Sequence, residues 1–309
     1  MTTPPDPVQA SPDLCDLLPT LAADVGQSLL RVQGTRRRSA TGLPWRTAGT
    51  LITPLHAVER DDKVEVTRPD GATFTAEVVG RDPSLDLALL RADAESSAAT
   101  WFGLGQTWRA TSSVRIAEPI LALARPGQTV RAAFGAIGVA GSSVRLGQGG
   151  TLDRYIEIDR QLPQGFSGAL VVDLRGQALG IAMRGVVRGA SIVLGDTTLD
   201  RVVSQLEQHG HVQRGYIGVG VHPGRLPTEL AQRLGRGRAL IVVALEDDGP
   251  ASKAGISLGD VIVAVDDDAV TTPLELRAAL EDRAQQRVSL SLIRGGASTV
   301  VEVEPGTRH

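Results

Sequence analysis

The 309-residue sequence is poor in cysteine, in aromatic residues and in net charge, and each shortage excludes something. Cys15 is the single cysteine, so no disulfide can form within the chain. Aromatic residues make up 3% of the chain, so its cores must be built from aliphatic side chains. A formal net charge of -3 provides no general attraction to nucleic acid or to an anionic membrane.

Long hydrophobic runs are also missing at the start of the chain. The first 25 residues contain five prolines, neither Lys nor Arg, and no apolar stretch long enough for a signal peptide or a membrane anchor. We therefore expect a cytoplasmic protein, and the single cysteine fits a reducing compartment. Because Pro, Asp and Ser are frequent over residues 1–24, we expect a flexible tail there.

Glycine is abundant, with 35 residues, and it divides residues 25–196 into short apolar or alternating runs. Examples are VEVTR at Val64–Arg68, PILALA at Pro119–Ala124 and GALVVDLRGQALGIAM at Gly168–Met183. This spacing is typical of an all-β barrel or sandwich. Ten or more strands in such a length would suit two small barrels.

The hydrophobic period changes after this β-rich region. In DTTLDRVVSQLEQHG, apolar residues recur at helical spacing from Leu199 to Leu206, and Gly210 follows. The pattern predicts a connecting helix and linker over residues 197–213. Residues 214–309 then combine strand patterns with further helix signals, which predicts an α+β domain.

One helix of that last domain has a clear start signal. Thr272 can cap the helix, Pro273 suits its first position, and Glu275 can close a capping box. The sequence therefore predicts that a helix begins at Pro273.

Ser167 is a candidate for chemistry. It lies in QLPQGFSGAL between Gly165 and Gly168, which predicts a tight bend with the hydroxyl at its tip. Such a serine is either a plain turn residue or a nucleophile. A nucleophile would need a base to take its proton and a buried acid to orient that base.

The rest of the chain offers one base and one acid for this role. Of the five histidines, only His56 lies in the β-rich region, in GTLITPLHAV. Asp86, in RDPSLDLALLR, precedes another apolar strand. Each residue alone has a structural explanation, since His56 can simply follow a strand and Asp86 can be a turn or cap residue. The chain order His, Asp, Ser is that of chymotrypsin-like barrels, which predicts that Ser167 faces the other two from a second barrel.

Four segments resemble the HtrA (Deg) serine proteases. GTLITPLHAV is similar to the family's histidine segment, DPSLDLALLR to its aspartate segment, PILALARPGQTVRAAFGAIG to its second-barrel hairpins, and DRQLPQGFSGALVVDLRGQALGI to its serine segment. The resemblance implies a mainly β, chymotrypsin-like double β-barrel followed by a PDZ domain. It implies that His56 is the general base, that Asp86 orients it and that Ser167 is the nucleophile. Residues Gly165, Phe166 and Ser167 would form the oxyanion hole.

The sequence departs from the family pattern near these residues. Phe166 stands where Asn is usual, Ala169 and Leu170 stand where Gly-Pro is usual, and Pro54-Leu55 replaces a small or polar pair. A positive φ at Ala169 would cost about 1 kcal/mol. The departures keep a second hypothesis open, in which the chain is a catalytically silent protease-like fold that acts as a PDZ-bearing binding or chaperone module.

The resemblance also implies a specificity pocket and an activity. Its walls would be residues 159–165, 181–183 and 190–194, whose apolar side chains favour small or medium aliphatic substrate residues. We expect a serine endopeptidase that cleaves unfolded or exposed protein segments through an acyl-enzyme, without a metal or other cofactor.

RGYIGVGV, DDGPASKAGISLGDVIVAVDDDAV and TPLELRAALE together resemble a PDZ domain, expected over residues 214–309. Such a domain binds a peptide as an added strand and holds its C-terminal carboxylate on backbone amides. The implied binding loop is Tyr216, Ile217, Gly218 and Val219. The expected partners are unfolded or partly folded proteins and C-terminal peptides, and not nucleic acid. A homotrimer is expected from the family alone, since no aromatic residue precedes Trp45 to support it.

Overall fold

The computed structural model forms two compact units. The first unit extends to Gly210 but leaves out residues 145–151, which group with residues 211–309 in the second unit. The residues described are 13–34, 39–46, 49–92, 107–146, 149–281 and 283–307.

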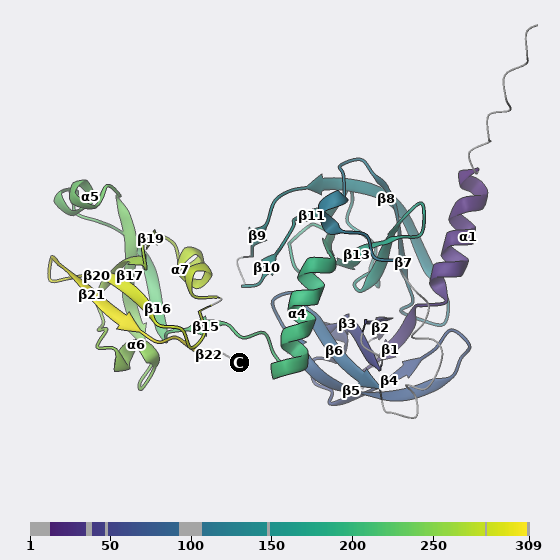
Figure 1. Ribbon diagram of the computed structural model, residues 1–309, viewed down its shortest axis with the longest axis horizontal. Helices are drawn as coiled ribbons and strands as arrows, with labels where there is room; N and C mark the ends of the chain where they lie inside the picture. Colours follow the sequence, from purple (N-terminus) through teal and green to yellow (C-terminus); the bar gives the residue numbers. More distant parts are fainter. Residues whose placement is uncertain are drawn as a thin grey trace, which may run out of the picture. The chain divides into compact units, whose positions relative to one another are not determined.

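The first unit contains two closed antiparallel barrels of six strands each, labelled in Figure 1. The strands of the first barrel are β1 (Leu30–Gln33), β2 (Ser39–Pro44), β3 (Thr50–Pro54), β4 (Lys63–Thr67), β5 (Thr73–Asp82) and β6 (Leu87–Ala92). Those of the second are β7 (Pro119–Ala124), β8 (Arg131–Ala140), β11 (Ile156–Ile158), β12 (Ala169–Asp173), β13 (Ala178–Met183) and β14 (Ile192–Leu194). The predicted mainly β double barrel is confirmed.

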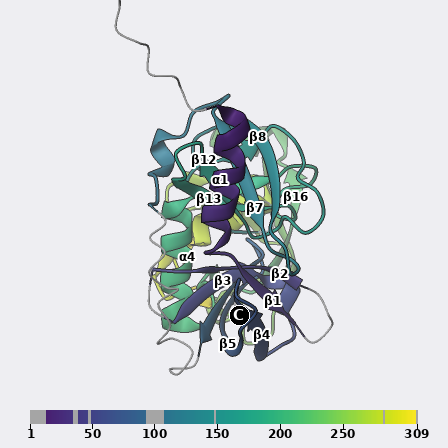
Figure 2. The ribbon, with the colours of Figure 1, turned by 90° about the vertical axis from the view of Figure 1, so that its right-hand side faces the viewer.

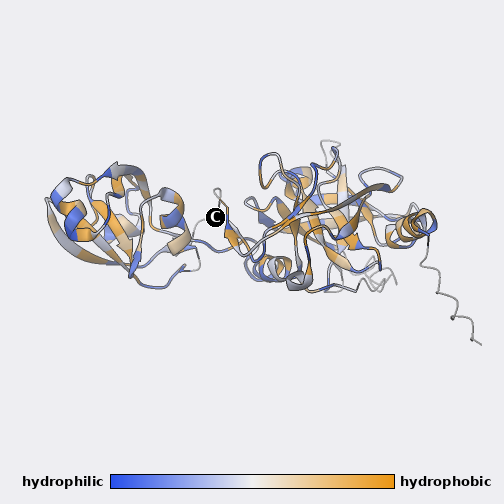
Figure 3. Ribbon diagram, turned by 90° about the horizontal axis from the view of Figure 1, so that it is seen from above, coloured by the Kyte–Doolittle hydropathy of each residue, from blue (hydrophilic) through white to orange (hydrophobic). Residues whose placement is uncertain are grey.

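Aliphatic side chains fill both barrels, as the scarcity of aromatic residues predicts. Figure 3 shows the apolar residues concentrated on the strands. Every residue of β12, β13 and β14 is buried, so these strands are covered on both faces. Two short strands, β9 (Val144–Arg145) and β10 (Thr151–Leu152), pair with each other, and a 3₁₀ turn, η2, covers Thr111–Ser113.

The expected flexible tail over residues 1–24 is wrong over residues 14–24, and residues 1–12 lie outside the described part of the chain. Helix α1 (Leu14–Gly26) begins at Asp13, whose side chain accepts a hydrogen bond from Cys15 N at 3.0 Å. The helix contacts β7, as Figure 2 shows, and its last residues, Val25 and Gly26, are buried. The abundance of Pro, Asp and Ser concealed this segment, because composition does not register the barrel surface that stabilises the helix.

The predicted helix after the barrels is α4 (Asp196–His209). It ends at Gly210, whose φ of 74° and N–H bond to Leu206 O form a left-handed cap. Its apolar stripe packs on β5, where a Cβ on Gly80 would lie 2.6 Å from Leu206 Cβ. The helix therefore belongs to the first unit and is not a free linker.

The second unit is an α+β domain built on an antiparallel sheet in the order β16-β17-β18-β20-β21, with β19 paired to β18. Its main strands are β16 (Val219–Arg225), β17 (Arg238–Leu245), β18 (Val261–Val265), β19 (Asp268–Ala269), β20 (Val288–Arg294) and β21 (Ala297–Val303). A small ladder joins β15 (Gly215–Tyr216) to β22 (Gly306–Thr307), and the helices are α5 (Thr228–Leu234), α6 (Pro250–Lys253) and α7 (Pro273–Leu280).

Helix α7 begins where the sequence predicts. Thr272 accepts a hydrogen bond from Glu275 N at 3.2 Å, and Glu275 in turn accepts from Thr272 N at 3.1 Å. Leu276 and Leu280 are buried in the core of the unit. No helix in the described ranges has the length and hydrophobicity needed to cross a membrane.

Candidate active site

His56 is presented by a single turn of helix, α2 (Leu55–Val58), that follows β3 directly. Pro54 ends the strand with an extended backbone, and Leu55 N donates to Asp86 O at 2.7 Å. Leu55 is buried, whereas about half of the His56 side chain is exposed. The departure at Pro54-Leu55 therefore anchors the turn in the barrel and leaves the imidazole accessible.

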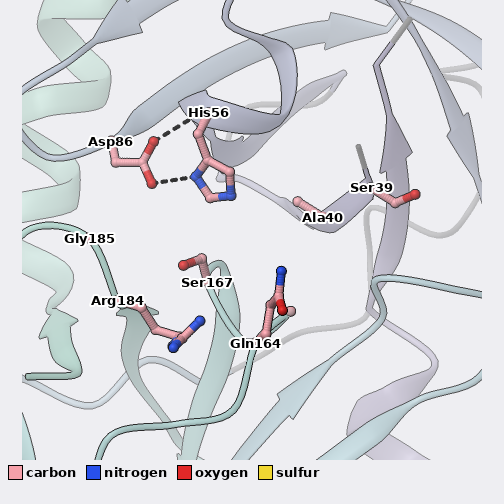
Figure 4. A pocket seen from close by; sticks show the side chains of 9 residues that line it. Ser39, Ala40, His56, Asp86, Gln164, Ser167, Arg184 and Gly185 are labelled. Carbon is pink, nitrogen blue, oxygen red and sulfur yellow. Dashed lines mark hydrogen bonds and ion pairs between the residues drawn. The ribbon is translucent and has the colours of Figure 1, made fainter. Parts of the chain in front are cut away.

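Asp86 holds His56 through both carboxylate oxygens. Its Oδ1 accepts from His56 N at 2.8 Å, and its Oδ2 lies 2.6 Å from His56 Nδ1, as Figure 4 shows. The φ of Asp86 is 55°, a left-handed conformation that few residues other than glycine adopt. With Nδ1 bound to a carboxylate, the other ring nitrogen, Nε2, is left to accept a proton.

Ser167 comes from the second barrel, just before β12. The two glycines around it have positive φ values, 91° at Gly165 and 82° at Gly168. A Cβ on Gly168 would lie 2.7 Å from Pro54 Cδ, in the residue pair that precedes His56. The absence of a side chain at Gly168 therefore lets the serine loop approach the histidine turn of the other barrel.

The three predicted residues line one pocket of about 300 Å³. Other walls come from Ser39 and Ala40 on β2 and from Gln164, Gly165, Arg184 and Gly185. The structure thus brings His56, Asp86 and Ser167 together, as the chain order predicts. No hydrogen bond within the described ranges engages Ser167 Oγ, and such a bond often forms only once substrate is bound.

Two backbone amides are available as oxyanion donors. Within the described residues, the N–H groups of Gly165 and Ser167 donate to no acceptor. The Phe166 N–H is different, because it donates to Pro163 O at 3.3 Å in a turn. Phe166 therefore supplies no amide to the predicted oxyanion hole, and the residue is 4% exposed and packs in the core of the second barrel.

The departures after the serine are accommodated without strain. Ala169 is not among the described residues with positive φ and begins the extended strand β12. Ala169 and Leu170 are both buried. The strain energy that a positive φ at Ala169 would cause is therefore absent.

Arg184 is the charged residue of this pocket that the sequence analysis missed, and Ser39, Ala40 and Gly185 also line it without having been predicted. One of the predicted walls, residues 181–183, ends at Met183, the last residue of β13, and Arg184 follows immediately. A charged residue directly after a buried apolar strand was the available signal, because the end of β13 lies beside the serine loop.

A second candidate site lies in the other unit. Ile217 is buried, Gly218 has a φ of 76°, and Val219 begins β16. In the described sheet β16 is the first strand of the order and pairs with β17 alone, so it is an edge strand. The predicted loop thus leads into an edge strand, which is what strand addition by a peptide requires.

The comparisons with known proteins agree with this architecture. A family profile described as "Trypsin-like peptidase domain" matches residues 40–181, and one described as "PDZ domain" matches residues 215–304. The "Probable periplasmic serine endoprotease DegP-like" of Brucella suis is 30% identical over 82% of this chain and 50% of its own length. The chain therefore spans about half the length of the curated relatives it matches.

Two solved structures extend the likeness over nearly the whole chain. The "HtrA-type protease AlgW with tripeptide" is 26% identical, with a TM-score of 0.68, and covers 94% of this chain and 97% of its own. The serine endoprotease from Yersinia pestis is 22% identical, with a TM-score of 0.72, and covers 97% and 100%, which shows the common fold.

The relatives contradict the expected cytoplasmic location. The Brucella protein and other curated relatives are named as periplasmic. The expectation rested on the composition of the first 25 residues and on a single cysteine, and a lack of disulfides is compatible with either compartment.

The family profiles, the curated relatives and the solved structures point the same way. The chain belongs to the HtrA (Deg) family of trypsin-like proteases with a PDZ domain.

Proposed function

We propose that this chain is a serine endopeptidase that cleaves unfolded or exposed protein segments. The observation that carries the proposal is that Asp86 contacts both the backbone N and the ring Nδ1 of His56, in the pocket that Ser167 also lines. The comparisons support the protease hypothesis, and nothing in them favours the catalytically silent alternative.

The chemistry follows from the position of each group. Ser167 Oγ attacks the carbonyl carbon of the scissile bond while His56 Nε2 takes its proton. The carbonyl oxygen becomes an oxyanion that the amides of Gly165 and Ser167 stabilise. The imidazolium formed on His56 is stabilised by Asp86 and gives its proton to the leaving amine as the C–N bond breaks.

The second half of the reaction repeats these roles with water. An ester now joins Ser167 Oγ to the acyl part of the substrate, and His56 removes a proton from the attacking water. The ester C–O bond breaks, the proton returns to Ser167 Oγ, and the acyl part leaves as a carboxylic acid. The residues named here complete the cycle without a further reactant.

Labelling of the nucleophile tests this proposal. We expect a fluorophosphonate probe to label the folded wild-type chain on Ser167 and the chain to degrade casein. The variant Ser167→Ala should lose both signals while it keeps the wild-type circular dichroism spectrum. Folded wild-type protein that stays unlabelled under conditions that label another member of the family would instead favour the silent module.

We further propose that the PDZ unit binds the C-termini of peptides or partly folded proteins, or regulates activity. The loop Tyr216–Val219 and the edge strand β16 support this role, and the related AlgW structure contains a tripeptide. Fluorescence anisotropy should show that a peptide with a free apolar C-terminus binds more tightly than its amidated form. Equal affinities would contradict capture of the carboxylate.

The oligomeric state stays a prediction. Light scattering of the full chain tests the trimer that the family implies.

A further inference from the structure

Arg184 brings a cation to the pocket of the proposed nucleophile. It follows the last residue of β13, and Figure 4 shows its side chain reaching toward the space beside Ser167 and Gln164. Gly185 comes next, and a Cβ on Gly185 would meet no atom within 4 Å. The end of β13 therefore offers open room for a substrate chain next to the guanidinium.

The guanidinium of Arg184 is unpaired within the described part of the chain. Its Nε is buried without a hydrogen-bond partner, and none of its nitrogens forms a hydrogen bond or an ion pair there. Two other arginines of this unit differ at their terminal guanidinium nitrogens, although the Nε of Arg125 also has no partner. Arg109 pairs with Glu118 and with Asp173, and Arg125 donates to the carbonyl oxygens of Gln128 and Gly26.

Among the described residues that line the pocket, none besides Asp86 has a carboxylate that could neutralise this charge. Asp86 is the acidic residue of its lining, and both of its oxygens are engaged by His56. A buried donor without an acceptor is costly, and a guanidinium is best satisfied by two parallel hydrogen bonds to a carboxylate. The missing partner can come from a substrate.

We propose that Arg184 is a specificity-determining residue that binds an acidic side chain, Glu or Asp, in the two substrate residues preceding the scissile bond. The proposal rests on the proposed protease function. It differs from the aliphatic preference that the apolar strands around the pocket favour, because a charge-assisted pair at the mouth of the pocket outweighs the contact of a small apolar side chain.

The test compares matched peptide substrates that differ only in one residue, placed either first or second before the cleaved bond, with Glu against Gln and Asp against Asn. Wild-type enzyme should cleave the acidic member of each pair with a kcat/KM about tenfold to a hundredfold higher. In Arg184→Met the acidic member should fall to the level of its amide partner. A wild-type enzyme that treats Glu and Gln alike at both positions would overturn the proposal, as would discrimination that survives in Arg184→Met.

Two further variants separate a charge effect from a structural one. Arg184→Lys keeps the positive charge and should keep a preference for Glu over Gln, reduced because an ammonium cannot form the bidentate pair. Arg188→Met removes an exposed arginine from the same loop and should leave the preference and the rate unchanged. If Arg184→Met and Arg184→Lys lost the cleavage of both peptides equally, the role of Arg184 would be structural and the proposal would fail.

A binding measurement keeps this inference separate from the proposed function. Ser167→Ala should bind an amidated Glu peptide about tenfold or more tightly than the Gln peptide, and the double variant Ser167→Ala/Arg184→Met should not. Amidation removes the C-terminal carboxylate that the PDZ unit would bind. Binding discrimination without labelling of Ser167 would refute the protease function alone, whereas labelling without discrimination would refute the role of Arg184 alone.

Discussion

The two candidate sites of this protein are built from different parts of the chain. The pocket of the first unit depends on side chains, with His56 and Asp86 from one barrel and Ser167 from the other. The loop before β16 in the second unit depends on backbone, with Gly218 at a φ of 76° and an edge strand after it. The chemistry proposed for the first site requires proton transfers, whereas the binding proposed for the second needs only hydrogen-bond donors in a row.

This difference teaches where each site is vulnerable. A site made of three side chains is destroyed by the loss of any one of them, even when the fold is intact. A site made of backbone amides tolerates most side-chain changes and fails when the conformation of the loop changes. The predictions below use this contrast.

The largest effect is expected for the base. His56→Ala should lower kcat for peptide cleavage by about 10⁶-fold, because Ser167 loses the group that takes its proton. Steady-state or single-turnover kinetics measure the loss, and anisotropy should show unchanged peptide binding at the PDZ unit. The matched control His209→Ala lies at the end of α4 and should cleave like wild type. Equal losses in the two variants would remove His56 from the mechanism.

A smaller loss is expected for the residue that orients the base. Asp86→Asn should lower kcat about 10⁴-fold, because an amide can hold the wrong tautomer of His56. The folded state should persist, since the Asn side-chain oxygen can still accept from His56 N. The measurement is the ratio of kcat in Asp86→Asn to kcat in wild type. A loss of less than tenfold would mean that the 2.6 Å contact between Asp86 and His56 does not contribute to catalysis.

Loss of an ion pair in the second barrel should lower the free energy of unfolding of the first unit and leave that of the second unit unchanged. The Arg109 guanidinium lowers the pKa of Glu118 through a hydrogen bond, and the Glu118 side chain is 10% exposed. Glu118→Gln leaves the partly buried Arg109 cation with one fewer anion, which should cost the first unit about 2 kcal/mol at pH 7. All three tryptophans precede residue 110, so their fluorescence in urea monitors this unit.

The pH dependence of that loss has a definite sign. Because the pKa of Glu118 is lower in the folded unit than in the unfolded chain, its contribution is complete above the unfolded pKa. The contribution disappears as the pH falls through the folded pKa. The difference between wild type and Glu118→Gln should therefore shrink below about pH 4. A difference that stays constant from pH 7 to pH 3 would contradict the assignment.

The smallest effect is expected for a backbone change in the PDZ loop. Gly218→Val should weaken C-terminal peptide binding about tenfold, because valine resists a positive φ and its Cβ would lie 3.1 Å from Glu246 Oε2. Cleavage of a short amidated peptide should be unchanged. The control Gly255→Val also has a positive φ, but its Cβ would meet open space. If both variants bound the peptide like wild type, Tyr216–Val219 would not be the carboxylate loop.

Several features could be predicted from local sequence alone. The capping box at Thr272 and Glu275 and the end of α4 at Gly210 depend on groups within four residues of one another, so the pattern suffices. The helix α1 could not be predicted in this way, because its stabilising surface is β7, about a hundred residues away in the sequence.

The sequence by itself determined the chemistry that is available: one histidine in the β-rich region, an aspartate before the next strand, and a serine between two glycines. The tertiary structure alone decided how these groups meet, since closing the two barrels places Gly168 against Pro54 and Asp86 against His56. It also decided that Arg184 lines the same pocket as His56. The physical reason is that these contacts join segments from 30 to more than 100 residues apart, and barrel closure sets their distances, which no local pattern encodes.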